Sequence, residues 1–150
     1  MNTHVEFKVP GEPQGKGRPR ATTINGMARL YTPKKTASYE GLIAHAAALA
    51  MAGRPPLSEP VRLDIDIVCT VPASWSGKKR MQALAGAIRP AKKPDADNVV
   101  KAVCDGLNGV VWVDDVQAVE GGWRKVYGPT PGVSVRVQLL QSAQQLELAA

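Results

Sequence analysis

Residues 92–120 read KKPDADNVVKAVCDGLNGVVWVDDVQAVE, and the rest of the chain is organised around this stretch. It holds six of the thirteen acidic residues, although the 150-residue chain has a net charge of +6 and a pI of about 9.6. A protein that binds an anion normally avoids such a concentration of carboxylates, because each of them repels the ligand. A divalent cation resolves the conflict, since Mg²⁺ prefers oxygen ligands and is usually held by a few carboxylates together with a substrate phosphate.

The middle of this stretch has the pattern of an amphipathic helix. Pro94 disfavours helical backbone at Lys93, so the chain is expected to enter in an extended form. Apolar residues at helical spacing then predict a helix over residues 97–108, which ends at Gly109. The apolar stripe consists of Val99, Val100, Val103, Cys104 and Leu107.

Acidic residues surround the start and the outer face of this predicted helix. Asp97, Lys101 and Asp105 are spaced four residues apart, so they form one exposed row. Asp95 lies just before the helix, where the N-terminal N–H groups favour an anionic side chain. Together with the single lysine between them, these positions predict a charged site along one side of the helix.

A predicted strand over residues 116–126 adds further carboxylates, because Asp114 and Asp115 directly precede it. If the strand returns past the start of the helix, one of these two residues meets Asp95 and Asp97. Three carboxylates and a lysine then share one site. The sequence therefore predicts a site for Mg²⁺, with Mn²⁺ as a substitute.

These motifs resemble the signature of the RusA family of Holliday junction resolvases, which is common in bacteria and their phages. The shared elements are D-x-D-N at residues 95–98, the lysine at 101, D-x-L at 105–107 and D-D at 114–115. The resemblance extends to G-K-G-R-P-R at residues 15–20 and to T-P-x-x-T-x-x-Y-E at residues 32–40. It therefore covers most of the chain, and the combination of motifs is specific.

The resemblance implies a Mg²⁺-dependent endonuclease that resolves four-way DNA junctions in recombination and repair by hydrolysing phosphodiester bonds. It implies that Asp95, Asp97 and Asp115 bind the metal and that Lys101 assists catalysis. It also implies a homodimer. One chain carries one acidic cluster, whereas a junction of approximate two-fold symmetry needs cuts in two strands, which a symmetric dimer supplies.

Basic residues gather on both sides of the acidic stretch. Residues 1–35 carry seven Lys or Arg and two Glu, largely within a Gly- and Pro-rich segment at 10–35 that is expected to be a long functional loop. Residues 78–93 carry six more and no acidic residue. Clustered cations suit the phosphate backbone of DNA, which such contacts position without reading its sequence. The predicted DNA contacts are Lys16, Arg18, Arg20, Lys92 and Lys93.

The rest of the pattern predicts a single α+β domain over residues 1–150, with a mixed, mostly antiparallel sheet packed against helices. Strands are expected at residues 5–9 and 61–67, and a helix at 37–52 with Thr36 as its N-cap. That helix is expected to bury Leu42, Ala46, Leu49 and Ala50. Further expected elements are a hairpin tip at residues 24–27, a short basic helix at 75–85, a last strand at 133–140 and a short helix or frayed tail at 141–150.

Several classes of protein are excluded by what the sequence lacks. No run of about 18 apolar residues predicts a membrane span, and the first residues show no signal-peptide pattern. Cys69 and Cys104 lie within apolar runs, where buried thiols are usual, and the two histidines are too distant to complete a zinc motif. The sequence predicts a cytoplasmic protein, and the family resemblance implies a bacterial cell.

Two alternatives use the same residues. Aspartates at a helix cap and before a strand are ordinary structural features, so the chain is also compatible with a junction-binding protein without catalysis. Substitution of Asp95 distinguishes a nuclease from a junction-binding protein. In a nuclease the substitution abolishes cleavage, whereas in a protein that uses Asp95 only as a helix cap it lowers stability and there is no cleavage to abolish. A nuclease of the PD-(D/E)xK kind is suggested by Pro94-Asp95, but no Asp or Glu followed two residues later by Lys occurs after it.

Overall fold

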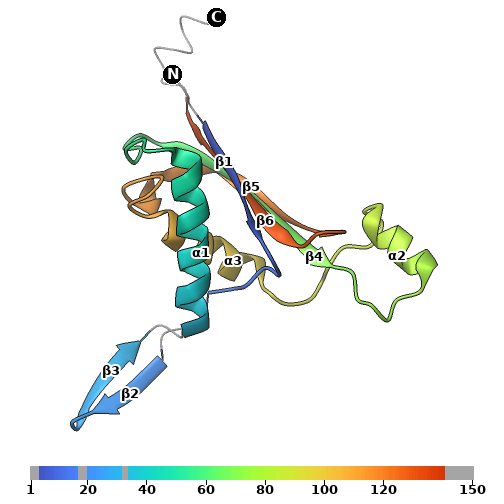
Figure 1. Ribbon diagram of the computed structural model, residues 1–150, viewed down its shortest axis with the longest axis horizontal. Coiled ribbons are helices and arrows are strands. Elements are labelled where there is room, and N and C mark those ends of the chain that lie inside the picture. The colour runs from blue at the N-terminus through green and yellow to red at the C-terminus, as the bar shows by residue number, and fades with distance from the viewer. Residues whose placement is uncertain (1–3, 17–19, 32–33, 141–150) are drawn as a thin grey trace, which may run out of the picture.

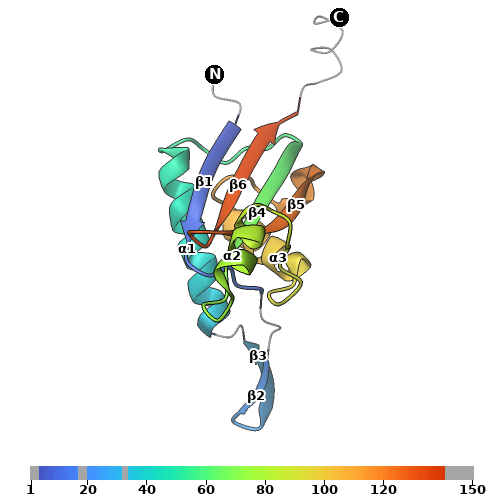
Figure 2. The same cartoon turned by 90° about the vertical axis from the view of Figure 1, so that its right-hand side faces the viewer.

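A four-stranded sheet forms the centre of the structure, a computed structural model that describes residues 4–16, 20–31 and 34–140 (Figure 1). Its strands are β1 (His4–Pro10), β4 (Val61–Thr70), β5 (Ala118–Gly128) and β6 (Gly132–Leu139). They lie side by side in the order β1-β6-β4-β5 (Figure 2). β6 pairs antiparallel with β1 and β4, whereas β5 pairs parallel with β4. The α+β class with a mixed, mostly antiparallel sheet is thereby confirmed.

Three helices, a 3₁₀ turn and a separate hairpin complete the described part of the fold. They are α1 (Lys34–Met51), α2 (Gly77–Leu84), α3 (Ala96–Leu107), the turn η1 (Asp115–Gln117), and the hairpin strands β2 (Arg20–Ile24) and β3 (Met27–Tyr31). α1 packs against both β1 and α3, and Figure 1 shows α1 and α3 on the same side of the sheet. α2 lies beyond one end of the sheet, and the hairpin projects from the start of α1 (Figures 1 and 2).

β4 shows why only one face of the sheet is covered. Its apolar side chains alternate with polar ones, and all of the apolar ones on one face are buried: Val61, Leu63, Ile65, Ile67 and Cys69. The opposite face carries exposed ion pairs, with 2.8 Å between Arg62 Nε and Asp64 Oδ2 and 2.7 Å between Arg124 Nε and Asp66 Oδ1. Asp64 and Asp66 therefore belong to a solvated face.

The prediction for the first helix was wrong at its start and for much of its buried face. α1 begins at Lys34, so Thr36 lies inside the first turn instead of at the N-cap. Leu49 is 69% exposed and Leu42 42% exposed, although Ala46 and Ala50 pack partly against the core. The buried row is Tyr39, Ile43, Ala47 and Met51. Both rows follow helical spacing in this alanine-rich segment, so contact with α3 decided which of them faces inward.

The other boundaries on the acidic side agree with the predictions to within a few residues. α3 begins and ends one residue before each predicted end. β5 begins at Ala118, because Val116 belongs to η1. α2 is shorter than predicted, since the hydroxyl of Ser76 accepts a hydrogen bond from the backbone N–H of Lys79 and thereby starts the helix there.

The basic segment at residues 10–35 is not one long loop, because β2 and β3 occupy much of it. The predicted hairpin tip is confirmed at Asn25–Gly26, between the two strands. The predicted tail at 141–150 lies outside the described residues. In the described ranges, no helix has both the length and the apolar character that crossing a membrane requires.

Gly106 lets α3 approach α1 closely. A Cβ atom at this position would lie 2.7 Å from Ile43 Cγ2 and 3.1 Å from the carbonyl oxygen of Glu40. Such overpacking typically costs about 1–3 kcal/mol, which exceeds the gain of up to about 1 kcal/mol when alanine replaces glycine in a helix. We expect Gly106→Ala to lower the free energy of unfolding in urea titrations. Gly41→Ala is the matched control, because nothing lies within 4 Å of its Cβ and only the stabilising contribution applies.

Candidate active site

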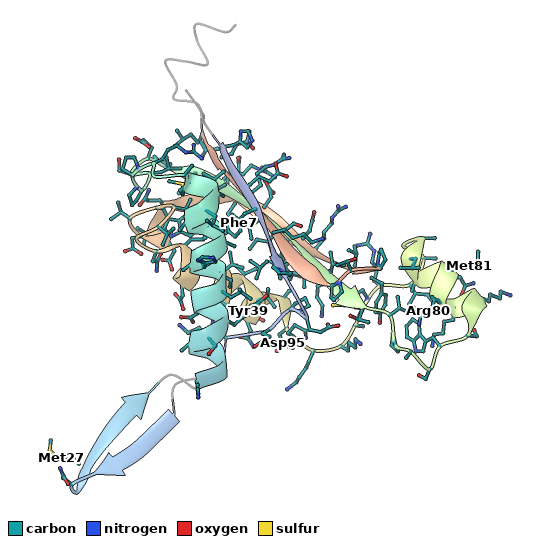
Figure 3. All side chains as sticks on the ribbon, in the orientation of Figure 1. Phe7, Met27, Tyr39, Arg80, Met81 and Asp95 are labelled. Atoms are coloured by element: carbon teal, nitrogen blue, oxygen red, sulfur yellow. The ribbon has the colours of Figure 1, made fainter. Side chains whose placement is uncertain are left out.

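Asp95 and Asp97 lie together where the chain enters α3. Asp95, which is labelled in Figure 3, occupies the N-cap position with φ −67° and ψ 136°, but its side chain accepts no capping hydrogen bond. Asp97 lies in the first turn. Both side chains are exposed, and within the described residues neither of them has a hydrogen bond or an ion pair. The two carboxylates are therefore available to a ligand from outside the chain.

The entry to α3 is held from two sides. The apolar stripe of the helix is buried in the core, with Val99, Val103 and Leu107 fully buried. Lys125 of β5 donates hydrogen bonds from its Nζ to the carbonyl oxygens of Lys92 (2.5 Å) and Pro94 (2.9 Å). β5 therefore passes the start of α3 near the C-terminal end of the strand, and not at the end that follows Asp115.

Asp115 lies in η1, which the side chain of Gln117 anchors. Its Oε1 accepts a hydrogen bond from the backbone N–H of Asp114 (3.0 Å), and its Nε2 donates to the carbonyl oxygen of Leu57 (2.9 Å). These bonds hold η1 before β5 begins. They place Asp115 near the C-terminal half of α3, whereas Asp95 lies at the opposite end of this helix.

The surroundings of Asp115 are acidic. Burial raises the pKa of its carboxyl, the hydrogen bond and charge of Asp114 raise this pKa further, and a hydrogen bond with Asn108 opposes the shift. Burial also raises the pKa of the Cys104 thiol to about 11, and the nearby charges of Asp115 and Asp105 add to that effect. Asp115 therefore shares its neighbourhood with Asp105, which lies eight residues, or about 12 Å of helix, beyond Asp97.

The structure thus places the predicted metal ligands in two groups. Asp95 and Asp97 are at the start of α3, and Asp115 is beside Asp105 and Asn108. Among the residues that the structure describes, no three His, Cys, Asp or Glu side chains are grouped closely enough to hold a metal ion. The assignment of all three carboxylates to one metal stays a prediction.

The donor set at the start of α3 fits Mg²⁺. Asp95 and Asp97 offer exposed carboxylate oxygens, and Mg²⁺ is commonly bound by one or two carboxylates together with waters and substrate phosphate. Lys101 lies one turn beyond Asp97, is exposed, and forms no ion pair within the described ranges. Lys101 therefore forms no ion pair with Asp97 or Asp105. A surface lysine with a purely structural role would be expected to pair with one of them.

Lys16 lies against α3, a position that the sequence did not indicate. Its Nζ forms a short ion pair with Asp105 and lies 3.9 Å from Oε1 of Glu40 on α1. The hydrogen bond to Asp105, and then the charge of that carboxylate, raise the pKa of Lys16, and burial raises the pKa of Glu40. The motifs that contain Lys16 and Glu40 were visible in the sequence, but nothing in their spacing showed that the two side chains meet.

The remaining predicted DNA contacts are distributed over the basic segments. Arg18 lies outside the described residues, and Arg20 is the first residue of β2. Lys92 and Lys93 are exposed just before α3, with the Lys92 ammonium 5.9 Å from the ring centre of Tyr127. In α2, the ammonium of Lys79 lies 4.0 Å from the ring centre of Trp75. Cations therefore border the carboxylates of Asp95 and Asp97 on the chain that leads into α3.

Comparison with known proteins shows the family of the chain. Residues 10–138 match the family described as Endodeoxyribonuclease RusA, a range that includes every candidate ligand. The chain is also 36% identical over 138 residues to the uncharacterized protein YqaN of Bacillus subtilis (strain 168). That alignment covers 89% of this chain and 95% of YqaN. With its acidic helix start, its basic flanks and a family match over most of its length, the chain belongs to the RusA endodeoxyribonuclease family.

Proposed function

We propose that the protein is a Mg²⁺-dependent endonuclease that resolves four-way DNA junctions in recombination and repair. The observation that carries this proposal is the pair of exposed carboxylates at the start of α3, which have no partner among the residues that the structure describes. Asp95 stands at the cap position without a capping hydrogen bond, so a role as helix cap does not account for it. Membership of the RusA family supports a metal-dependent nuclease with a branched-DNA substrate.

Asp95 and Asp97 are the residues that would hold the metal, with Asp115 as the third proposed ligand. When bound, Mg²⁺ would polarise the scissile phosphate, activate a water molecule and stabilise the leaving oxygen. The exposed ammonium of Lys101 is suited to neutralise the charge that builds on the phosphate in the transition state. Lys92 and Lys93 are suited to hold the DNA backbone beside this helix start.

Cleavage of a synthetic four-way junction tests this function directly. Purified protein is mixed with the junction or with a linear duplex of matched sequence, in Mg²⁺, in Mn²⁺ or in EDTA. We expect either metal to support cutting of the junction, little cutting of the duplex, and none in EDTA. Tight binding of the junction without any cutting would instead support a junction-binding protein without catalysis.

The hairpin β2–β3 is the second feature that suits DNA. Residues 13–35 contain six Lys or Arg and no acidic residue. The hairpin projects from the body, with Met27 exposed at its tip (Figures 1 and 3). A two-stranded ribbon of this kind fits the major groove of DNA, which is about 12 Å wide. We therefore propose that this basic hairpin contacts one duplex arm of the junction.

Salt dependence measures the contribution of the hairpin. Each phosphate contact that is lost lowers the slope of log affinity against log salt by about 0.9 on duplex DNA. We expect Arg18→Ala/Arg20→Ala to weaken junction binding and to flatten this slope by about 1.8. Lys8→Ala/Arg136→Ala is the matched control, because it removes two charges from the uncovered sheet face. Equal slopes for all three proteins would exclude Arg18 and Arg20 from the DNA interface.

A further inference from the structure

Residues 15 and 16 cross α3 directly beside the candidate site. The backbone N–H of Lys16 donates a 3.0 Å hydrogen bond to the carbonyl oxygen of Asn98, the residue after Asp97. A Cβ atom on Gly15 would lie only 2.9 Å from Cβ of Asn98. The absence of a side chain at Gly15 therefore permits this close approach. The segment that leads to the basic hairpin is thus attached to the first turn of α3.

The side chain of Lys16 adds a second attachment. Its ammonium pairs with Asp105, two turns further along α3, and approaches Glu40 on α1. The three side chains are only 32%, 28% and 24% exposed, respectively, so salt screens this cluster less than an open surface pair. Oε1 of Glu40 is buried and has no hydrogen-bond partner among the described residues, which leaves Lys16 as the cation that offsets its charge.

The charges around Lys16 argue against a direct role in DNA binding. Asp105, Glu40 and Asp115 all act on its ammonium, and all three favour its charged form. A phosphate that approached Lys16 would meet these carboxylates as well, and they would repel it. The sequence prediction that Lys16 contacts the DNA backbone therefore fits this environment poorly.

We propose that Lys16 is a positioning residue that fixes the root of the basic hairpin on the helix that carries Asp95 and Asp97. This proposal rests on the proposed function, because the hairpin and the helix start must engage the same junction. The ammonium of Lys16 connects the loop before the hairpin to Glu40 on α1 and to Asp105 on α3. The hydrogen bond from the backbone N–H of Lys16 to Asn98 fixes where along α3 this loop is attached. Lys16 also offsets the negative charge of Asp105, Glu40 and Asp115, which lowers the repulsion that a DNA strand meets beside α3.

Two measurements separate this role from a phosphate contact. We expect Lys16→Ala and Asp105→Asn each to lower kcat/KM for junction cleavage by roughly tenfold or more, the loss typical when a supporting partner of an active site is removed. Because the two residues act as one pair, the double variant should be no worse than either single one. Lys16→Arg should keep most of the activity, and the salt slope of binding should be unchanged by Lys16→Ala.

A slope that falls by about 0.9 in Lys16→Ala, with normal cleavage by Asp105→Asn, would instead make Lys16 a phosphate contact and overturn the proposal.

Hydrogen exchange without DNA tests the attachment even if the protein cleaves no junction. We expect Lys16→Ala and Asp105→Asn to speed exchange at the amides of residues 14–16 by a similar factor. Arg136→Ala is the control, because it breaks an exposed ion pair with Glu6 on the far face of the sheet. Unchanged exchange in both variants would overturn the proposal, whereas failure of cleavage in the wild type would count only against the nuclease function.

Discussion

Junction cleavage is expected to fall by more than about a hundredfold in Asp95→Asn and in Asp97→Asn, while junction binding persists or tightens. Loss of a residue that merely supports a metal ligand typically costs 10–100-fold, and loss of a direct ligand is expected to cost more. Binding is retained because each substitution removes a negative charge that repels the DNA backbone. Cleavage assays and electrophoretic mobility shifts on the same protein preparations measure the two effects separately.

The stability of Asp95→Ala distinguishes a ligand from a helix cap. Replacing a capping side chain with alanine costs about 0.5–2 kcal/mol, but Asp95 accepts no capping hydrogen bond. We therefore expect Asp95→Ala to change the free energy of unfolding by less than about 0.5 kcal/mol. Ser76→Ala is the matched control, since Ser76 does cap α2 and should show the full cost. Folded Asp95→Asn and Asp97→Asn proteins that still cleave with Mg²⁺ would end the metal assignment.

Mixed dimers of wild type and Asp97→Asn are expected to nick one strand and rarely to resolve the junction. One chain supplies one site, and a two-fold dimer presents two sites to the approximate two-fold symmetry of the junction. A supercoiled cruciform plasmid separates the outcomes, because one nick gives an open circle and paired cuts give a linear product. The wild-type protein should yield mainly the linear product, and the mixture should shift toward the open circle.

The strand order favours one of the last two strands as the interface of this proposed dimer. β5 and β6, the last two strands, are the candidates for its interface, but β6 is paired on both edges, with β1 and β4. In the described part of the chain β5 pairs with β4 alone, and it exposes 60% of Val119 and 57% of Trp123. We therefore expect Trp123→Arg to weaken the dimer in sedimentation velocity experiments. Wild-type protein that sediments as a monomer, even with junction DNA bound, would contradict the dimer itself.

The local pattern of apolar and polar residues predicted several elements well, because in these elements only one face is apolar enough to be buried. β4 alternates apolar and charged residues, so only one face of this strand can be buried. α3 has a clear apolar stripe between Pro94 and Gly109. Proline restricts the backbone before a helix and glycine favours its C-terminal end, so these two residues mark the ends of the helix. α1 differs, because its many alanines make two rows nearly equal in size and polarity. Its buried row followed from the contact between Ile43 and Gly106, which no local pattern contains.

By itself, the sequence determined the α+β class, the start of α3, and the concentration of carboxylates within a basic chain. These properties depend on residues that are close together in the sequence and on the total charge of the chain, and both are known from the sequence alone. Only the tertiary structure decided that Asp115 lies beside Asp105 and that Lys16 pairs with the same residue. Such contacts join residues that are far apart in sequence. They depend on how α1, α3 and η1 pack around a shared core, and that packing sets which charges meet.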